Sequence, residues 1–178
     1  MKGMIFREFI DFSEEHFGLE VVDAMIESCQ LSSDGAYTSV GTYDHGELTQ
    51  MLAVLSESQG IAVDELLRRF GHHLFHFLAH SYPEIVRPKG DAFDFIGKID
   101  NHIHVEVKKL YPEAELPSFT FTQTGPDEAT LFYESDRGLA ELAVGLLKGR
   151  FEHLQQPVVI EQEDVSDGSK KEVRFTLK

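Results

Sequence analysis

Three histidines recur at intervals of four residues in the first half of the chain, at His72, His76 and His80. On an α-helix this interval places side chains on one face, where neighbouring imidazoles can bind a transition-metal ion. A metal site usually also takes ligands and a shielding shell from other segments. Two interpretations stay open: a helical zinc-binding module or small metal-dependent hydrolase that uses these histidines, and a solvated helix face without a metal.

A second pair, His102 and His104, is separated by two residues, so on a helix the two side chains point in different directions. His102 shares its face with Lys98, Glu106 and Lys109, which is typical of a face exposed to solvent. His104 shares its side with a mostly apolar set, namely Phe93, Gly97, Val107 and Tyr111. Such a histidine is either a hydrogen-bonded core residue or an imidazole presented to a haem iron.

A third group, Tyr133, Ser135 and Arg137, lies between a predicted strand and a predicted helix. Alternate residues of an extended chain share a face, so the two hydroxyls can point together. A cation in the first turn of a helix opposes the macrodipole, so Arg137 does not serve helix stability. The group can bind carboxylates or phosphates. The alternative is a surface arginine paired with Glu134 or Asp136.

The segments that carry these residues are predicted from the spacing of apolar residues. A period near 3.6 predicts helices at residues 1–17, 21–29, 47–59, 64–80, 93–110 and 139–154, with Asp64 as the cap of the fourth. Alternation of apolar and polar residues predicts strands at residues 118–124, 129–133, 157–162 and 171–177.

The connections between these segments have their own composition. Residues 31–43 are rich in Ser, Gly and Thr and predict a loop, and Pro83 and Pro88 interrupt the chain after the fourth helix. Residues 167–169 predict a hairpin turn between the last two strands. The fold class is therefore α+β in a single domain. A helical half, residues 1–82, packs on a second half, residues 83–178, which holds an antiparallel sheet of about four strands with flanking helices.

Composition excludes several classes of function. The 178 residues carry a net charge of −15 and no basic patch, which argues against binding to nucleic acid or to an acidic membrane. No apolar run approaches the roughly 18 residues of a membrane-spanning helix. Arg7, Glu8 and Asp11 interrupt the apolar N-terminal stretch, unlike in a signal peptide, so we expect a cytoplasmic location. Cys29 is the single cysteine, which excludes an internal disulfide and favours a buried or inert thiol.

The histidine helix and the third group occur together in a known family, the haem nitric oxide/oxygen-binding (H-NOX) domains, which are related to the haem domain of soluble guanylate cyclase. The chain resembles these domains over nearly its whole length. The similarity begins with MKGMIFREFI and FGLEVVDAMI, continues through HIHVEVKKLYPEAELPSF, and includes the Tyr-x-Ser-x-Arg motif as YESDR.

The resemblance implies a b-type haem, bound without covalent attachment between the two halves. The family's iron ligand precedes the tyrosine of a Tyr-Pro pair by seven residues, and Tyr111-Pro112 places it at His104. The motif residues Tyr133, Ser135 and Arg137 would bind the haem propionates, and Pro117 would press on the macrocycle. The distal wall would consist of Ile5, Phe9, Leu74, Leu142 and Leu146.

The departures from the family pattern concern the choice of gas. Oxygen-binding members carry a distal tyrosine five residues after the motif arginine, where this chain has Leu142, and a tryptophan and an asparagine in place of Phe9 and Leu74. The resemblance therefore implies a non-enzymatic sensor that binds nitric oxide and carbon monoxide without a distal hydrogen-bond donor. Nitric oxide would break the bond between iron and His104, and the two halves would then shift. Output would pass to a separate histidine kinase or to a cyclic-di-GMP enzyme, either a diguanylate cyclase or a phosphodiesterase.

Overall fold

The computed structural model describes residues 1–86, 91–167 and 171–178. The first half forms four helices, α1 (Gly3–Phe17), α2 (Leu19–Ser28), α3 (His45–Gln59) and α4 (Val63–Ser81). The second half begins with three short helices and a π-helical turn, in the order α5 (Pro83–Val86), α6 (Ala92–Ile96), the turn Ile99–Ile103 and α7 (His104–Leu110). It ends with β1 (Ser118–Gln123), β2 (Ala129–Ser135), α8 (Ala140–His153), β3 (Ile160–Asp164) and β4 (Lys171–Leu177).

The helices of the first half agree with the predicted segments, with one correction at a cap. Ala62 precedes α4 and makes no capping hydrogen bond, so the prediction that Asp64 caps this helix is wrong. Asp64 lies in the first turn instead, where its charge complements the positive end of the helix dipole. The loop predicted over residues 31–43 contains turns and irregular chain, as expected. It is held against α3 by Glu47, whose buried carboxylate accepts hydrogen bonds from Ser33 and Tyr37.

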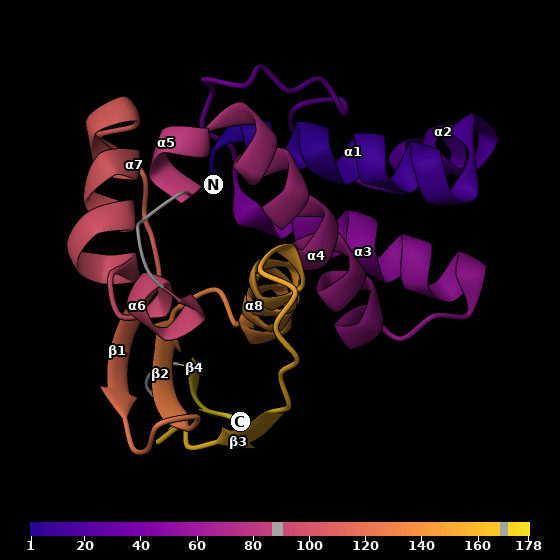
Figure 1. The fold of residues 1–178 in the computed structure, drawn as a ribbon. Coiled ribbons are helices and arrows are strands. Elements are labelled where there is room, and N and C mark those ends of the chain that lie inside the picture. Colours follow the sequence, from indigo (N-terminus) through magenta and orange to yellow (C-terminus); the bar gives the residue numbers. More distant parts are fainter. Residues whose placement is uncertain (87–90, 168–170) are drawn as a thin grey trace.

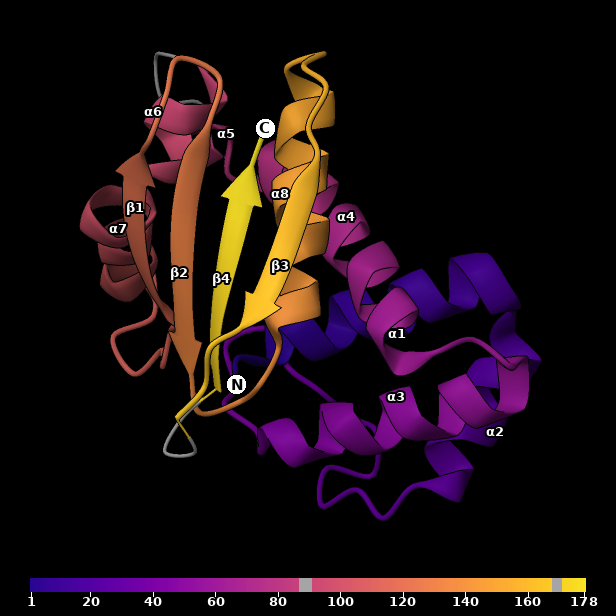
Figure 2. The same ribbon diagram turned by 90° about the horizontal axis from the view of Figure 1, so that it is seen from below.

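The predicted antiparallel sheet of about four strands is confirmed, and its strand order is β1-β2-β4-β3 (Figure 2). Alternation places Ala129, Leu131 and Tyr133 of β2 on the buried face, while Phe132 is exposed. The strand predicted at residues 157–162 is displaced, because β3 runs from Ile160 to Asp164 and Val159 pairs with Lys178 beyond its start. Pro88 and the predicted turn residues Gly168 and Ser169 lie outside the described residues.

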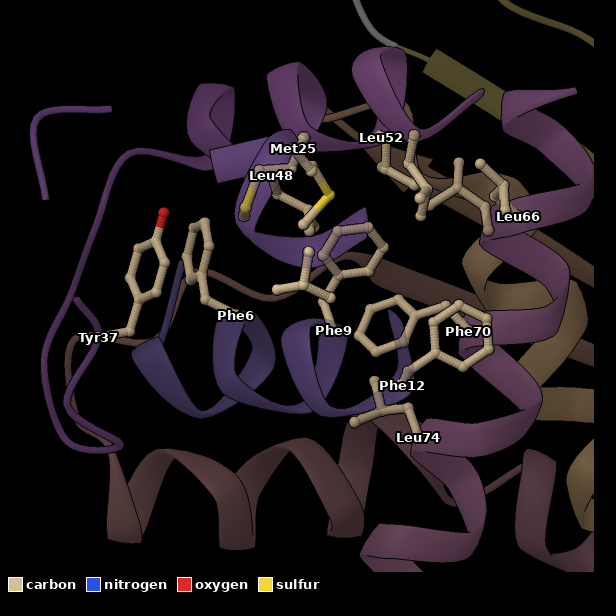
Figure 3. Close-up of a cluster of buried hydrophobic side chains, with 14 of the residues drawn as sticks. Phe6, Phe9, Phe12, Met25, Tyr37, Leu48, Leu52, Leu66, Phe70 and Leu74 are labelled. Atoms are coloured by element: carbon tan, nitrogen blue, oxygen red, sulfur yellow. The ribbon is translucent and has the colours of Figure 1, made fainter. Parts of the chain in front are cut away.

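Two clusters of buried side chains form the interior. The first joins α1, α2, α3 and the first part of α4, and its centre is a group of phenylalanines that includes Phe9, Phe12 and Phe70 (Figure 3). The second joins the sheet to α8 and to the short helices that precede the sheet.

Among the described helices, none combines the length and the apolar character needed to cross a membrane. Burial raises the pKa of the Cys29 thiol, which favours an inert side chain.

The two clusters are joined where α4 lies against α8, and α8 in turn lies between α4 and the sheet (Figure 1). Glycines allow this approach. A Cβ added at Gly71 would overlap the carbonyl oxygen of Leu142, and a Cβ added at Gly145 would overlap that of Arg68. Neither obstacle is the end of a flexible side chain, so neither could yield without a movement of the helix backbones. The spacing of α4 and α8 is therefore set by backbone contact.

We expect Gly145→Ala to destabilise the protein by about 1–3 kcal/mol, the usual cost of overpacking a close contact. Gly46→Ala in the first turn of α3 is the matched control, because a Cβ there has no neighbour nearer than 3.4 Å. The control should be neutral or slightly stabilising, since alanine favours helix more than glycine does. Urea unfolding measures both variants, and equal stability of Gly145→Ala and the unaltered protein would contradict the close contact.

Candidate functional site

A cavity of about 510 Å³ lies between the two halves of the chain. Its lining includes Ile5 from α1, Leu74 from α4 and Leu142 from α8 on the helical side. His104 of α7 and Tyr133 of β2 line the part formed by the second half. The volume is within the range of small-molecule and cofactor sites, which are mostly apolar with a few well-placed polar groups.

The helix predicted over residues 93–110 is not continuous, and the interruption decides how His104 is presented. α6 ends before Gly97, a π-helical turn covers Ile99–Ile103, and α7 begins at His104. A π-helical turn has more residues per turn than an α-helix, so it changes which side chains share a face. Val107 and Tyr111 line the cavity with His104, whereas Phe93 and Gly97 do not. His102 is exposed, as predicted. Single π-helical turns are frequent at functional sites.

His104 lies beside the half-buried side chain of Asp100, whose role was not predicted from the sequence. The His104 Nδ1 atom is 2.8 Å from Asp100 Oδ1, and that oxygen is buried with no other hydrogen-bond partner among the described residues. Asp100 Oδ2 accepts a hydrogen bond of 2.9 Å from the backbone N–H of Phe119 at the start of the sheet. The spacing of four residues between Asp100 and His104 was the available signal.

Electrostatics favour the neutral form of the His104 imidazole. Burial lowers its pKa, and the nearby carboxylate of Asp100 opposes that shift without cancelling it. Neutral imidazole is the form that binds a metal. A carboxylate beside the second ring nitrogen is the usual arrangement around a metal-binding histidine, because it orients the ring and raises its basicity.

The three motif residues come together at the rim of the cavity. Tyr133 is buried in β2, and its hydroxyl accepts a hydrogen bond of 3.1 Å from the backbone N–H of Leu139. Ser135 ends β2, and its Oγ accepts a 3.1 Å hydrogen bond from the backbone N–H of Arg137. Burial raises the pKa of Tyr133, so the hydroxyl remains a neutral hydrogen-bonding group.

The Arg137 guanidinium is already turned toward a carboxylate. It donates to the backbone carbonyl of Glu115 at 2.8 Å and to Oε2 of the same residue at 2.6 Å. Neither Glu134 nor Asp136, the sequence neighbours considered above, is this partner. The Arg137 side chain is only 16% exposed, whereas that of Glu115 is 85% exposed. Arg137 is therefore a mostly buried cation with an exposed partner.

The apolar wall agrees in part with the predicted set. Ile5, Leu74, Leu142 and Leu146 line the cavity, and so does Pro117 in the segment before β1. Phe9 is absent from the lining and is fully buried in the first core, where its ring centroid is 5.2 Å from that of Phe70 (Figure 3). The reason is that the cavity reaches only the first turn of α1, and Phe9 lies one turn farther along.

Several cavity-lining residues with hydrogen-bond donors were also not predicted, among them Tyr82 and Arg150. The Tyr82 hydroxyl lies 3.6 Å from Met4 Sδ and 3.4 Å from the Tyr111 hydroxyl, so it already has partners. Arg150 is 3% exposed, donates to the Val86 carbonyl at 3.1 Å, and its Nε has no partner in the described chain. The four aliphatic residues of the predicted wall carry no donor, whereas other residues of the lining do.

The three histidines at four-residue spacing, His72, His76 and His80, do not line this cavity. His72 and His76 lie on the outer side of α4, where Glu152 of α8 approaches both of them. His80 is exposed and does not belong to this group. The predicted set of His72, His76 and His80 is therefore wrong in its third member, because α4 carries His80 past the end of the contact with Glu152.

Haem fits the residues that line the cavity. An apolar space receives a flat hydrophobic ring, and His104 offers a neutral imidazole with an otherwise unsatisfied carboxylate oxygen behind it. Haem propionates are two carboxylates, and Tyr133, Ser135 and Arg137 supply hydroxyls and a positive charge at the rim.

Comparison with known proteins also indicates a haem-binding domain. Residues 2–162 match the model of the haem-NO-binding family. A Drosophila melanogaster protein described as soluble guanylate cyclase 89Db is 29% identical over 151 residues. The match covers 82% of this chain and 22% of that protein, so the chain spans about a fifth of the length of this relative.

Solved structures with this fold include H-NOX proteins from bacteria. The unliganded Fe(II) H-NOX protein from K. algicida is 39% identical with a TM-score of 0.94, covering 100% of this chain and 96% of that one. The H-NOX from Shewanella woodyi, solved with IWP-051 in the Fe(II)CO state, is 44% identical with a TM-score of 0.84, covering 100% and 94%. An H-NOX protein from S. oneidensis in the Fe(II)NO state is 26% identical with a TM-score of 0.86, covering 100% and 99%.

H-NOX domains bind haem and act as gas sensors, and they are not catalytic domains. The family match extends over nearly the whole chain, and the structural similarity covers both halves. This chain therefore belongs to the haem-NO-binding (H-NOX) family.

Proposed function

We propose that residues 1–178 form one H-NOX domain, divided near residue 82, which senses nitric oxide through haem held by His104. Bound haem supplies a ferrous iron that binds nitric oxide and carbon monoxide. The observation that carries the proposal is the position of His104, on the wall of an apolar cavity with Asp100 Oδ1 at 2.8 Å from its Nδ1. This leaves Nε2 as the nitrogen for the iron.

His104 also connects the cavity to the rest of the second half. It is the first residue of α7, directly after the π-helical turn. Asp100 within that turn accepts a hydrogen bond from the backbone N–H of Phe119 in β1. A change in the position of the imidazole is therefore passed to the sheet through Asp100 and Phe119. Arrangements of this kind can convert an event at a ligand into a shift between two states of a protein.

The choice of gas follows from the aliphatic wall. Bound oxygen carries partial negative charge and is stabilised by a nearby donor, whereas nitric oxide binds ferrous haem without one. Leu142, Leu74, Leu146 and Ile5 offer no donor. The Tyr82 hydroxyl is engaged with Met4 and Tyr111. Arg150 is a further donor of the lining and is held by the Val86 carbonyl. The aliphatic wall and the engaged Tyr82 hydroxyl support selectivity for nitric oxide over oxygen.

The signal would pass to a separate protein in the cytoplasm, either a histidine kinase or a cyclic-di-GMP enzyme. The support is the acidic character of the chain, with a net charge of −15, which complements a basic or mixed patch on a partner. Measurement of the complex at rising salt concentration distinguishes such a contact from a mainly apolar one, because only the charged contact weakens with salt.

The first prediction concerns the iron ligand. His104→Gly should lose haem or bind it only when free imidazole is added, because the cavity then lacks its axial nitrogen. His102→Ala is the matched control and should leave the absorption spectrum nearly unchanged, since His102 is exposed. Absorption spectra of the purified variants measure this. Loss of haem in His102→Ala with retention in His104→Gly would mean that the ligand is misassigned.

The second prediction concerns the rim of the cavity. Arg137→Ala should release haem about ten- to a hundredfold faster, since a hydrogen bond to a charged group contributes about 1.5–3 kcal/mol. Arg174→Ala is the control, because Arg174 is 42% exposed on β4 and pairs with Glu163. Transfer of haem to excess apomyoglobin gives both rates. Equal rates in the two variants would count against Arg137 as the anchor of the propionates.

The third prediction concerns oxygen. The unaltered ferrous protein should bind nitric oxide and carbon monoxide but should not retain oxygen in air. Leu142→Tyr places a hydroxyl on the wall and should raise oxygen affinity about ten- to a hundredfold. Absorption spectra under each gas measure these affinities. Retention of oxygen by the unaltered protein, and its loss in Tyr82→Phe, would show that Tyr82 is a donor and that the wall does not select against oxygen.

A further inference from the structure

Two imidazoles and a carboxylate meet on the outer surface of the molecule, where α4 lies against α8. They belong to His72 and His76, one helical turn apart on α4, and to Glu152 near the end of α8. Each residue offers a nitrogen or oxygen atom that lies within 4.8 Å of those of the other two. The imidazole centroids are 4.7 Å apart, and the Glu152 carboxylate makes a short contact with His72 Nε2.

We propose that His72, His76 and Glu152 form a binding site for a divalent transition-metal ion of the zinc type, which bridges α4 and α8. Two histidines and a glutamate are a recurrent ligand set for zinc, with a water molecule completing the tetrahedron. This site is separate from the cavity and does not depend on haem.

The ligand distances are compatible with a metal after a small adjustment. With zinc bonds of about 2.0–2.2 Å, tetrahedral ligand atoms are about 3.3 Å apart. In the structure the three ligand atoms are up to 4.8 Å apart, so side chains must move by about an ångström or more to bind zinc. Glu152 and His76 are exposed and His72 is half-buried, so rotamer changes at the surface can supply this movement. The ion would replace the hydrogen bond between His72 Nε2 and the Glu152 carboxylate.

Backbone contacts between α4 and α8 hold the ligands from the two helices close together. Gly71, next to His72, contacts the α8 backbone, and a Cβ at Gly149 would approach the Phe75 side chain to 2.8 Å. Since both helices are fixed by these contacts, the ligands from α4 and α8 approach one another without a rearrangement of the fold. A metal here would hold together the same two helices that carry Leu74 and Leu142 of the cavity wall.

Positively charged side chains near the site limit its affinity for a metal cation. Arg68 and Arg69 border the same surface depression, but their guanidinium groups are paired with Glu141 and Glu65. Lys148 also borders it and opposes a cation. With three protein ligands and partial exposure, we expect a dissociation constant for zinc in the micromolar range, weaker than that of closed four-ligand sites.

Zinc titration of the haem-loaded protein by calorimetry tests the site. The unaltered protein should bind one equivalent, and His76→Ala and Glu152→Gln should each lower the affinity at least about tenfold. His80→Ala is the matched control, because this histidine lies on the same helix at the same spacing and outside the group, and it should leave the affinity unchanged.

Thermal unfolding with and without zinc tests the bridge. Zinc should raise the melting temperature of the unaltered protein and of His80→Ala, because an ion that binds only the folded state stabilises it. It should not do so for Glu152→Gln, which removes the ligand supplied by α8. The proposal is overturned if the unaltered protein binds no zinc, if His80→Ala lowers the affinity as much as His76→Ala, or if Glu152→Gln keeps full affinity.

Discussion

The backbone contact of α4 with α8 is the constraint on which the site depends. Gly71 and Gly145 let the two helices approach until a Cβ on one would meet a carbonyl oxygen of the other. The first core lies on one side of this contact and the sheet with its own core lies on the other. Leu74 and Leu142 are brought to a common wall by the same crossing. The cavity is thus a consequence of how two separately packed halves are joined.

The polar groups that would hold haem come from the second half of the chain, while the helical half adds further polar residues to the lining, including Tyr82. His104 has Asp100 behind it, Asp100 is hydrogen-bonded to the β1 backbone, and Arg137 follows directly from the end of β2. An apolar enclosure strengthens the effect of each of these groups, because their charges and dipoles are poorly screened there. The helical half contributes mainly the aliphatic wall. This division of roles explains why a ligand that contacts both halves can affect their relative positions.

Much of this arrangement could be predicted from the sequence, and the remainder has physical reasons. Periodicity predicted the long helices and the sheet, because these depend on apolar patterns of local origin. The break between α6 and α7 could not be predicted, since a π-helical turn has no periodic signal of its own and is stabilised by its surroundings. Asp100 was missed although its four-residue spacing to His104 was a signal, and Glu115 was missed because its contact with Arg137, 22 residues away in sequence, is visible only in three dimensions. The position of Phe9, outside the lining of the cavity, could not be predicted, because the sequence does not show how far a cavity extends along a helix.

The central claim is that His104 binds the iron from this cavity with Asp100 behind it. Resonance Raman spectroscopy of the unliganded ferrous protein tests the claim directly, since an iron–histidine stretching band reports both the bond and the basicity of the imidazole. We predict that the band is present in the unaltered protein and shifts in frequency in Asp100→Asn, because the carboxylate raises the basicity of the ring. A protein without such a band, or with a band that is unchanged in Asp100→Asn and lost in His102→Ala, would contradict the account.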